Sequence, residues 1–223
     1  MSGTTKRAEP YIWVTWVVGL LAGDDNCHWS AWFKGHFKHT PVNKDDGPLK
    51  KWKNDHANMV SDRVALLRKQ GYTVYMEDQN KFNLKGKTGI TLGGTPDIVA
   101  VNTEHVLVVD CKSGKRRDKD YWQVVIYMLM LPHTHEEVKK LDPKRPIIGQ
   151  VQYRDGILKI GAEEAIDVAD VVTKQIQESG GVEQPKRVAS KRECKFCNIG
   201  RVDCPVRIDE ADTGEPRHHT DIF

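Results

Sequence analysis

The sequence lacks a long hydrophobic run, a strong net charge and any internal repeat. Its longest apolar stretch, residues 11–22, is too short for a membrane helix, which needs about 20 residues. The formal net charge is only +3, so the total charge does not identify a partner. No low-complexity segment is present, which argues against a repetitive chain. We therefore expect a folded protein that does not cross a membrane.

The sequence also lacks a clear export signal. Lys6 and Arg7 precede the apolar stretch, as they would in a signal peptide, but no small-x-small cleavage site clearly follows it. We therefore expect a cytoplasmic protein. In that reducing compartment the five cysteines are more readily thiols or metal ligands than disulfide partners.

What is present is the composition of a globular protein. A chain of 223 residues, 39% hydrophobic and 29% charged, fits one domain with a small appended subdomain. Two short basic runs are concentrated enough to contact a phosphate backbone: Lys112–Lys119 and Pro185–Lys195. Either run alone is equally compatible with a solvated charged face.

The stretch 93–112 carries the strongest functional signal. It predicts two short apolar strands joined by a polar turn at residues 102–104. Asp97 opens the first strand, and Asp110 and Lys112 share a face at the end of the second, with Cys111 directed the opposite way. Pairing of these strands would bring Asp97 beside Asp110. Two carboxylates and a lysine suit a divalent cation and a phosphate substrate, although a solvated surface pair is the alternative.

These residues also resemble a family signature. Gly94-Thr95-Pro96-Asp97 followed by Asp110-Cys111-Lys112 resembles the core motif of the PD-(D/E)XK nucleases. Gln123 and Tyr127 resemble the Gln-x-x-x-Tyr element of the RecB-type branch. The resemblance implies an αβββαβ restriction-endonuclease-like core, which is a mixed α/β sheet flanked by helices. It also implies Mn²⁺ or Mg²⁺ as a cofactor.

The resemblance further implies a set of metal ligands. His56, Asp97 and Asp110 would bind the cation together with the backbone carbonyl of Cys111. The alternative for His56 is a hydrogen-bonded core histidine, because it lies on the apolar stripe of a predicted helix.

Three more residues receive catalytic roles from the resemblance. Lys112 would position the attacking water and offset charge on the phosphate. Gln123 and Tyr127 would orient the lysine or the nucleic acid. Because Tyr127 has aromatic neighbours in Tyr121 and Trp122, simple core packing is its alternative role.

Hydrophobic spacing and turn residues predict the remaining elements. We expect a short helix carrying Cys27. We also expect long helices over residues 49–70, 118–131 and 163–178, a strand at 72–77, and hairpins at 82–92 and 147–161. The second of the long helices should end before Pro132.

Three cysteines near the end of the chain form a second constellation. Cys194-x-x-Cys197 and Cys204 resemble a metal-ligand run, which needs a fourth ligand to complete it. Cys27 is the candidate. One cysteine near the start and three near the end resemble the iron-staple nucleases, which implies a structural [4Fe–4S] cluster. Zinc is the competing metal, because four thiolates suit both.

Cys27 with Trp32 also resembles a segment of the CRISPR-associated RecB-like exonucleases. The resemblance implies a DNA exonuclease acting in CRISPR adaptation, with an integrase as a possible partner. The basic runs, together with Tyr121 and Trp122, predict single strands or overhangs as its substrate. The alternatives are a phage or repair nuclease that processes DNA ends, and a non-catalytic, zinc-stapled DNA-binding module. The sequence does not give the oligomeric state.

The basic run after Asp110 and the two aromatic residues that follow it are the predicted DNA contacts. We expect phosphate contacts from Lys115, Arg116 and Arg117, and base stacking on Tyr121 and Trp122. We expect a single RecB-type nuclease domain over 1–223, with a nuclease core at 49–181. Segments 1–48 and 182–223 would form the cluster-binding subdomain, and 209–223 would be a flexible tail.

Overall fold

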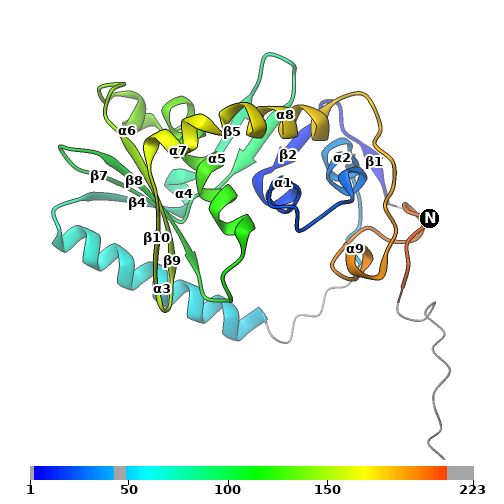
Figure 1. Cartoon of the computed structure of the whole chain (residues 1–223), viewed down its shortest axis with the longest axis horizontal. Coiled ribbons are helices and arrows are strands. Elements are labelled where there is room, and N and C mark those ends of the chain that lie inside the picture. The colour runs from blue at the N-terminus through cyan, green and yellow to red at the C-terminus, as the bar shows by residue number, and fades with distance from the viewer. Residues whose placement is uncertain (1–2, 43–48, 210–223) are drawn as a thin grey trace, which may run out of the picture.

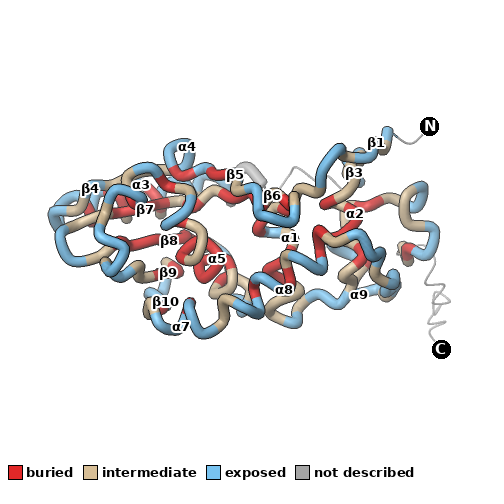
Figure 2. The backbone as a smooth tube through the Cα atoms, turned by 90° about the horizontal axis from the view of Figure 1, so that it is seen from above, coloured by how far each residue is buried: buried red, intermediate tan, exposed pale blue. Residues whose placement is uncertain are grey.

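The computed structural model describes residues 3–42 and 49–209, with side chains of the second range described from residue 53 onward. The expected tail lies outside the described residues, apart from Asp209. No helix in the described part of the chain is both long and apolar enough to cross a membrane. The molecule is elongated, with its main sheet at one end and α2 and α9 at the other (Figures 1 and 2).

The main sheet has five strands in the order β10-β9-β8-β7-β4. Their bounds are β4 Thr73–Met76, β7 Ile98–Val101, β8 Val106–Lys112, β9 Ile147–Tyr153 and β10 Gly156–Ile160. Only β8 and β9 pair in parallel within this sheet, and its other pairings are antiparallel. The predicted strand pair at residues 98–112 is therefore confirmed, as is the predicted hairpin β9-β10.

Two long helices cover opposite faces of this sheet, α3 (Leu49–Lys69) and α5 (Asp118–Thr134). Because side chains alternate along a strand, β8 contributes residues to both cores. Leu107, Val109 and Cys111 join a cluster with α3, whereas Val106 and Val108 join the cluster that includes α5. Helix α3 ends at Lys69, one residue before the predicted end at residue 70, and is followed by the predicted terminator Gly71, whose positive φ of 85° is a conformation that glycine adopts without strain.

A smaller sheet has the order β2-β6-β5. It comprises β2 Tyr11–Trp13, β5 Phe82–Lys85 and β6 Thr91–Gly94, with β2 parallel to β6. Helix α1 (Val14–Leu21) continues directly from β2. Val14 and Val17 are fully buried in the same hydrophobic cluster as Val124 of α5. Residues of the N-terminal segment thus pack against residues of the segment 49–181, and the proposed subdivision stays a prediction.

The far end of the molecule joins the two ends of the chain. Helix α2 (His28–His36) lies beside α9 (Lys191–Lys195), and strand β1 (Thr5–Lys6) pairs with β3 (Phe37–Lys38) (Figure 1). Trp29, Trp32, Phe33 and Ile199 form a separate hydrophobic cluster there. The remaining elements are α4 Glu77–Asn80, α6 Glu136–Lys139, α7 Ala162–Asp167 and α8 Ala169–Gly180.

Three predicted helix boundaries were wrong. Helix α5 passes through Pro132 to Thr134, because only one backbone donor is lost and His135 N still donates to Leu131 O at 3.1 Å. The helix expected at 163–178 is divided at Val168 into α7 and α8, which lets both halves bury a side chain in the core. Cys27 immediately precedes α2 instead of lying within it.

Candidate active site

The candidate site forms where β7 begins and its antiparallel neighbour β8 ends. Ile98 pairs with Val109, so the next position brings Asp97 opposite Asp110, as the sequence predicted. The backbone N–H of Cys111 donates to Asp97 Oδ2 at 2.7 Å. The Cys111 side chain is buried on the α3 face, and burial raises the pKa of its thiol to about 12. These contacts fix the Asp97 carboxylate at the end of the strand pair.

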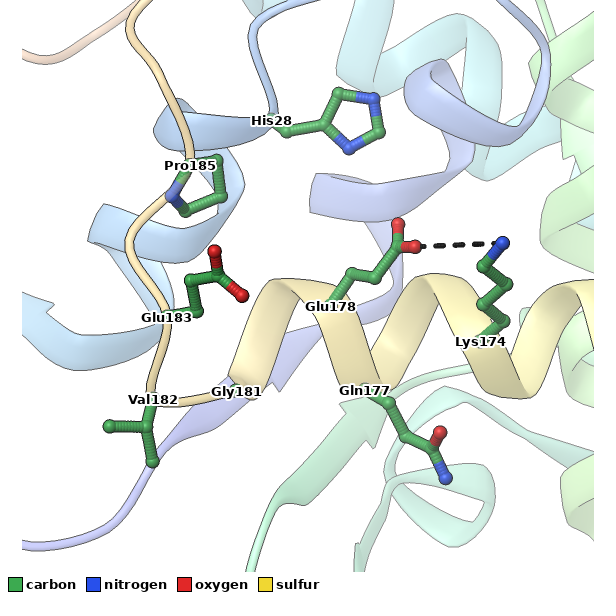
Figure 3. A pocket seen from close by; sticks show the side chains of 8 residues that line it. All are labelled: His28, Lys174, Gln177, Glu178, Gly181, Val182, Glu183 and Pro185. Carbon is green, nitrogen blue, oxygen red and sulfur yellow. Dashed lines mark ion pairs between the residues drawn. The ribbon is translucent and has the colours of Figure 1, made fainter.

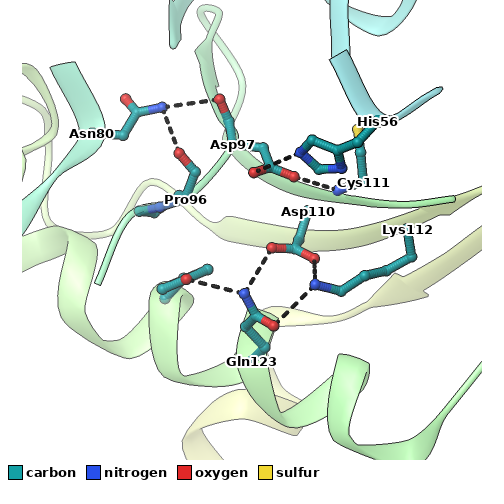
Figure 4. Close-up of polar contacts among 9 residues, drawn as sticks. His56, Asn80, Pro96, Asp97, Asp110, Cys111, Lys112 and Gln123 are labelled. Carbon is teal, nitrogen blue, oxygen red and sulfur yellow. Dashed lines mark hydrogen bonds and ion pairs between the residues drawn. The ribbon is translucent and has the colours of Figure 1, made fainter. Parts of the chain in front are cut away.

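A polar network on the opposite face joins β8 to α5 (Figure 4). Lys112 Nζ lies 2.5 Å from Asp110 Oδ2 and donates to Gln123 Oε1 at 3.0 Å. Gln123 Nε2 donates to Asp110 Oδ1 at 3.0 Å and to the Tyr127 hydroxyl at 3.1 Å. The spacing of four residues on α5 therefore brings Gln123 and Tyr127 to Asp110 and Lys112, as expected for one helix face.

Burial sets the electrostatics of this network. Asp110 is only 2% exposed. Burial raises the pKa of Asp110 to about 6, while the neighbouring Lys112 ammonium acts to lower it. Burial acts to lower the pKa of Lys112, but the charge and hydrogen bond of Asp110, together with the charges of Asp97 and Asp120, outweigh burial, and the pKa of Lys112 is raised. The two side chains therefore form a partly desolvated ion pair, unlike a solvated surface pair.

Tyr127 is both a network member and a core residue. Its side chain is 2% exposed, and burial raises the pKa of its hydroxyl. A Cβ at Gly94 would lie 2.9 Å from Tyr127 Cε1 and 2.8 Å from the Phe82 ring. Glycine at this motif position therefore allows the tyrosine to approach the β5-β6 hairpin. The core role and the network role coexist.

His56 reaches the same strand ends from α3. Its Nε2 lies 3.5 Å from Asp97 Oδ1, and hydrogen bonding with Asp97 raises the pKa of His56. The side chain is half-buried at the rim of the site (Figure 4). The helix on one face of the sheet thus supplies His56, and the helix on the other face supplies Gln123.

Two residues near the site were missed by the sequence reasoning. Asn80 is buried, and its Nδ2 donates to the carbonyl oxygen of Pro96 at 3.1 Å, which holds the loop before Asp97 (Figure 4). Glu77 follows β4, and its ligand oxygen lies within 4.8 Å of ligand atoms of both His56 and Asp97. Glu77 could have been considered as a site residue, because it is the charged last residue of the strand predicted at 72–77. Nothing in the sequence marked Asn80.

The predicted DNA-contacting residues differ in whether they already contact another part of the protein. Lys115 and Arg117 are exposed. Arg116 is also exposed, but its Nη2 donates to Asp155 at 3.0 Å and its guanidinium lies 4.8 Å from the centre of the Tyr153 ring. It is therefore already partnered within the protein.

The two aromatic residues expected to stack on bases are only partly accessible. Tyr121 and Trp122 are half-buried and pack against the main hydrophobic cluster. Their rings meet edge to face, with centroids 5.5 Å apart. Much of each ring is therefore used in packing.

The four cysteines predicted as ligands converge at the other end of the molecule. Cys27, Cys194, Cys197 and Cys204 line one cavity, between α2 and the segment that follows α8. All are free thiols. Within the described residues, no three of these sulfurs all lie within 4.8 Å of one another. The three ligand atoms that do lie this close belong to His56, Glu77 and Asp97, at the strand-end site.

Polar contacts hold the walls of this cysteine cavity. The Glu193 carboxylate accepts hydrogen bonds from the backbone N–H groups of Asn26 and Cys27, at 3.1 and 3.2 Å. Arg207 is buried and donates to the carbonyl oxygens of Cys197 and Ile199, at 2.7 and 2.8 Å. The Glu193 contacts join the N-terminal and C-terminal walls of the cavity, and the Arg207 contacts hold the C-terminal wall together. None of them was anticipated from the sequence.

A third, more open pocket lies beside the end of α8 (Figure 3). His28, Glu178 and Glu183 are among its lining residues, and Lys174 Nζ lies 3.9 Å from Glu178 Oε1. Pro185, the first residue of the second basic run, lines it, whereas the residues predicted for catalysis and metal binding do not.

The fold and site together define a mixed α/β domain with carboxylates, a lysine and a glutamine at the end of a central strand pair. A family model described as "PD-(D/E)XK nuclease superfamily" matches residues 25–204, and the chain belongs to this superfamily. The solved structure titled "Crystal structure of SSO0001" is similar in fold, with a TM-score of 0.51, 16% sequence identity, and coverage of 92% of this chain and 90% of that one. No curated protein matches the chain.

Proposed function

We propose that the protein is a RecB-type, metal-dependent DNA nuclease that hydrolyses phosphodiester bonds. Membership of the superfamily indicates divalent-metal nuclease chemistry. The observation that carries the proposal is the buried Asp110–Lys112 pair beside Asp97, held by Gln123. Such a pair at a strand end has no evident role in packing, but it suits a phosphate substrate.

The residues present fit a divalent cation. Oxygen ligands with one imidazole suit Mn²⁺, and oxygen ligands suit Mg²⁺. Asp97, Asp110, His56 and the Cys111 carbonyl are the ligand set that we propose. When bound, the cation would polarise the scissile phosphate and lower the pKa of a coordinated water.

Lys112 has the central catalytic role in this proposal. Its ammonium group would orient the attacking water and offset charge that develops on the phosphate. Gln123 would hold the Lys112 side chain in place, because it contacts both Lys112 Nζ and Asp110 Oδ1 at 3.0 Å. Tyr127 would fix Gln123 in turn through its hydroxyl, 3.1 Å from Gln123 Nε2.

We propose single-stranded DNA and overhangs as substrates and exonucleolytic trimming as the activity. Exposed Lys115 and Arg117 offer sequence-independent phosphate contacts. The exposed parts of Tyr121 and Trp122 offer limited stacking surface. The resemblance at Cys27 and Trp32 favours processing of spacer precursors in CRISPR adaptation, with an integrase as partner. Phage or repair processing of DNA ends would use the same chemistry.

For the cysteine cavity we propose a structural [4Fe–4S] cluster bound by Cys27, Cys194, Cys197 and Cys204. All four line one cavity, so the donor set fits the group. Zinc is the competing metal, because four thiolates suit both; the resemblance to the iron-staple nucleases favours the iron–sulfur cluster. A reducing cytoplasm, which keeps thiols available as ligands, is the compartment that we propose.

A cleavage assay tests the nuclease proposal. The substrates are one end-labelled strand, a duplex with an overhang and a blunt duplex, each with Mn²⁺ and with EDTA. We expect Mn²⁺-dependent shortening, fastest on the strand and the overhang, and its loss in Lys112→Ala. Binding without cleavage under all conditions would favour the non-catalytic module, and faster digestion of blunt duplex would contradict the substrate preference.

A further inference from the structure

Three neighbouring strand ends place three carboxylates in a row. Strand β4 pairs with β7 through Met76 and Ile98, so the next position sets Glu77 opposite Asp97. The N–H of Glu77 donates to the Asp97 carbonyl at 3.2 Å, which extends the pairing by one step. On the other side of Asp97, the pairing of β7 with β8 sets Asp110 opposite it. Asp97 is therefore the middle carboxylate, between Glu77 and Asp110.

The two outer carboxylates differ in their surroundings. Asp110 is buried, with Gln123 bound to one oxygen and Lys112 beside the other. Glu77 is exposed, and within the described residues its carboxylate has no hydrogen bond or ion pair. Because Lys112 already compensates the charge of Asp110, the negative charge still available to a cation lies on Glu77 and Asp97.

An imidazole completes this side of the site. His56, Glu77 and Asp97 each offer a ligand atom, and these atoms all lie within 4.8 Å of one another. Asp110 is not part of this group. Carboxylate oxygens suit Mn²⁺ and Mg²⁺, and imidazole nitrogen is a ligand of divalent transition metals. The Glu77 carboxylate itself has no hydrogen bond or ion pair within the described residues that it would have to give up in order to contribute.

We propose that Glu77 is a ligand of the divalent cation, and that the position formed by His56, Glu77 and Asp97 is the one that binds the cation in the absence of DNA. This inference rests on the proposed nuclease function and adds Glu77 to its ligands.

Calorimetric titration of the full chain with Mn²⁺, without DNA, tests the proposal. The informative variants are Glu77→Gln and Asp110→Asn, which each remove a charge and preserve size. Asp78→Asn is the matched control, because Asp78 is exposed on the same short helix and outside the ligand group. We expect Glu77→Gln to weaken the tightest binding event by ~10-fold or more, the range for disturbed metal sites. Asp110→Asn and Asp78→Asn should change it less than about threefold, well below that range.

Two results would overturn the inference. One is a tight binding event in Glu77→Gln equal to that in Asp78→Asn. The other is a loss in Asp110→Asn as large as that in Glu77→Gln. Neither result bears on the nuclease function itself, which the Lys112→Ala cleavage assay tests separately.

Discussion

The strand-end site and the cysteine cavity are assembled in opposite ways. At the strand-end site, hydrogen bonds within the protein already hold Asp97, Asp110, Lys112 and Gln123 in place. The site is flanked by two large hydrophobic clusters. At the cysteine cavity, the hydrophobic cluster has four buried members among the described residues, and no three of the four sulfurs there all lie within 4.8 Å of one another.

The difference indicates two kinds of dependence on a bound group. The strand-end site is a consequence of folding, because its polar groups satisfy one another. The cysteine cavity closes a small region in which the two chain ends meet, and free energy of metal binding there adds directly to folding free energy. We therefore expect loss of the divalent cation to affect chemistry, and loss of the cysteine-bound group to affect stability.

The largest expected effect is on the cysteine side. Cys27→Ser should release iron and sulfide from protein purified without oxygen and remove its brown colour. It should also destabilise the terminal region by roughly 4 kcal/mol or more, as expected when a structural metal group is lost. Iron and sulfide analysis and thermal unfolding measure the two effects.

Cys111 supplies the matched control for that experiment. It is buried in the core beside α3 and outside the cysteine cavity. Cys111→Ala should lower stability through lost packing but retain the wild-type iron content. Stoichiometric zinc without sulfide in the wild-type protein would contradict the cluster assignment.

The next effect is on catalysis. Asp110→Asn and Lys112→Ala should each lower the cleavage rate by about 10³-fold, the scale associated with loss of a preorganised charge-stabilising group. Both variants should keep their iron and change the melting temperature little in comparison with Cys27→Ser. Near-wild-type cleavage by either variant would show that the active site is misassigned.

A smaller catalytic effect is expected from Gln123→Leu. Loss of its contacts to Lys112 and Asp110 should lower the cleavage rate by roughly 10- to 100-fold, since the lysine remains but is less well oriented. Gln175→Leu is the control, because Gln175 is also buried and hydrogen-bonded, to Ser179 at 3.1 Å. Equal cleavage rates for the two variants would remove the positioning role of Gln123.

The smallest effect should come from Glu193→Ala. Its carboxylate accepts hydrogen bonds just before α2, at 3.1 Å from Asn26 N and 3.2 Å from Cys27 N. Removing a carboxylate from a helix N-terminus costs about 1–2 kcal/mol. Thermal unfolding should show this loss in Glu193→Ala but not in Glu183→Ala. A loss in both variants would mean that Glu193 has no special role.

The parts of the site that were predictable depend on local periodicity. Strand alternation placed Asp110 and Lys112 on one face of the sheet, and the spacing of four residues placed Gln123 and Tyr127 on one face of a helix. Glu77 was missed because its position depends on β4 pairing with β7, across more than 20 residues of chain. Glu193 was missed because its partners, Asn26 and Cys27, are at the other end of the sequence. Pairing between distant segments leaves little trace in the pattern of a single sequence.

The most direct test of the contrast between the two regions is hydrogen exchange measured by mass spectrometry. We would compare the anaerobically purified protein, the same protein treated with EDTA, and Cys27→Ser. The account predicts that EDTA leaves protection over residues 106–112 and 118–134 unchanged, whereas Cys27→Ser loses protection over 28–36 and 190–208. Loss of protection over 106–112 on EDTA treatment, or unchanged protection over 190–208 in Cys27→Ser, would contradict it.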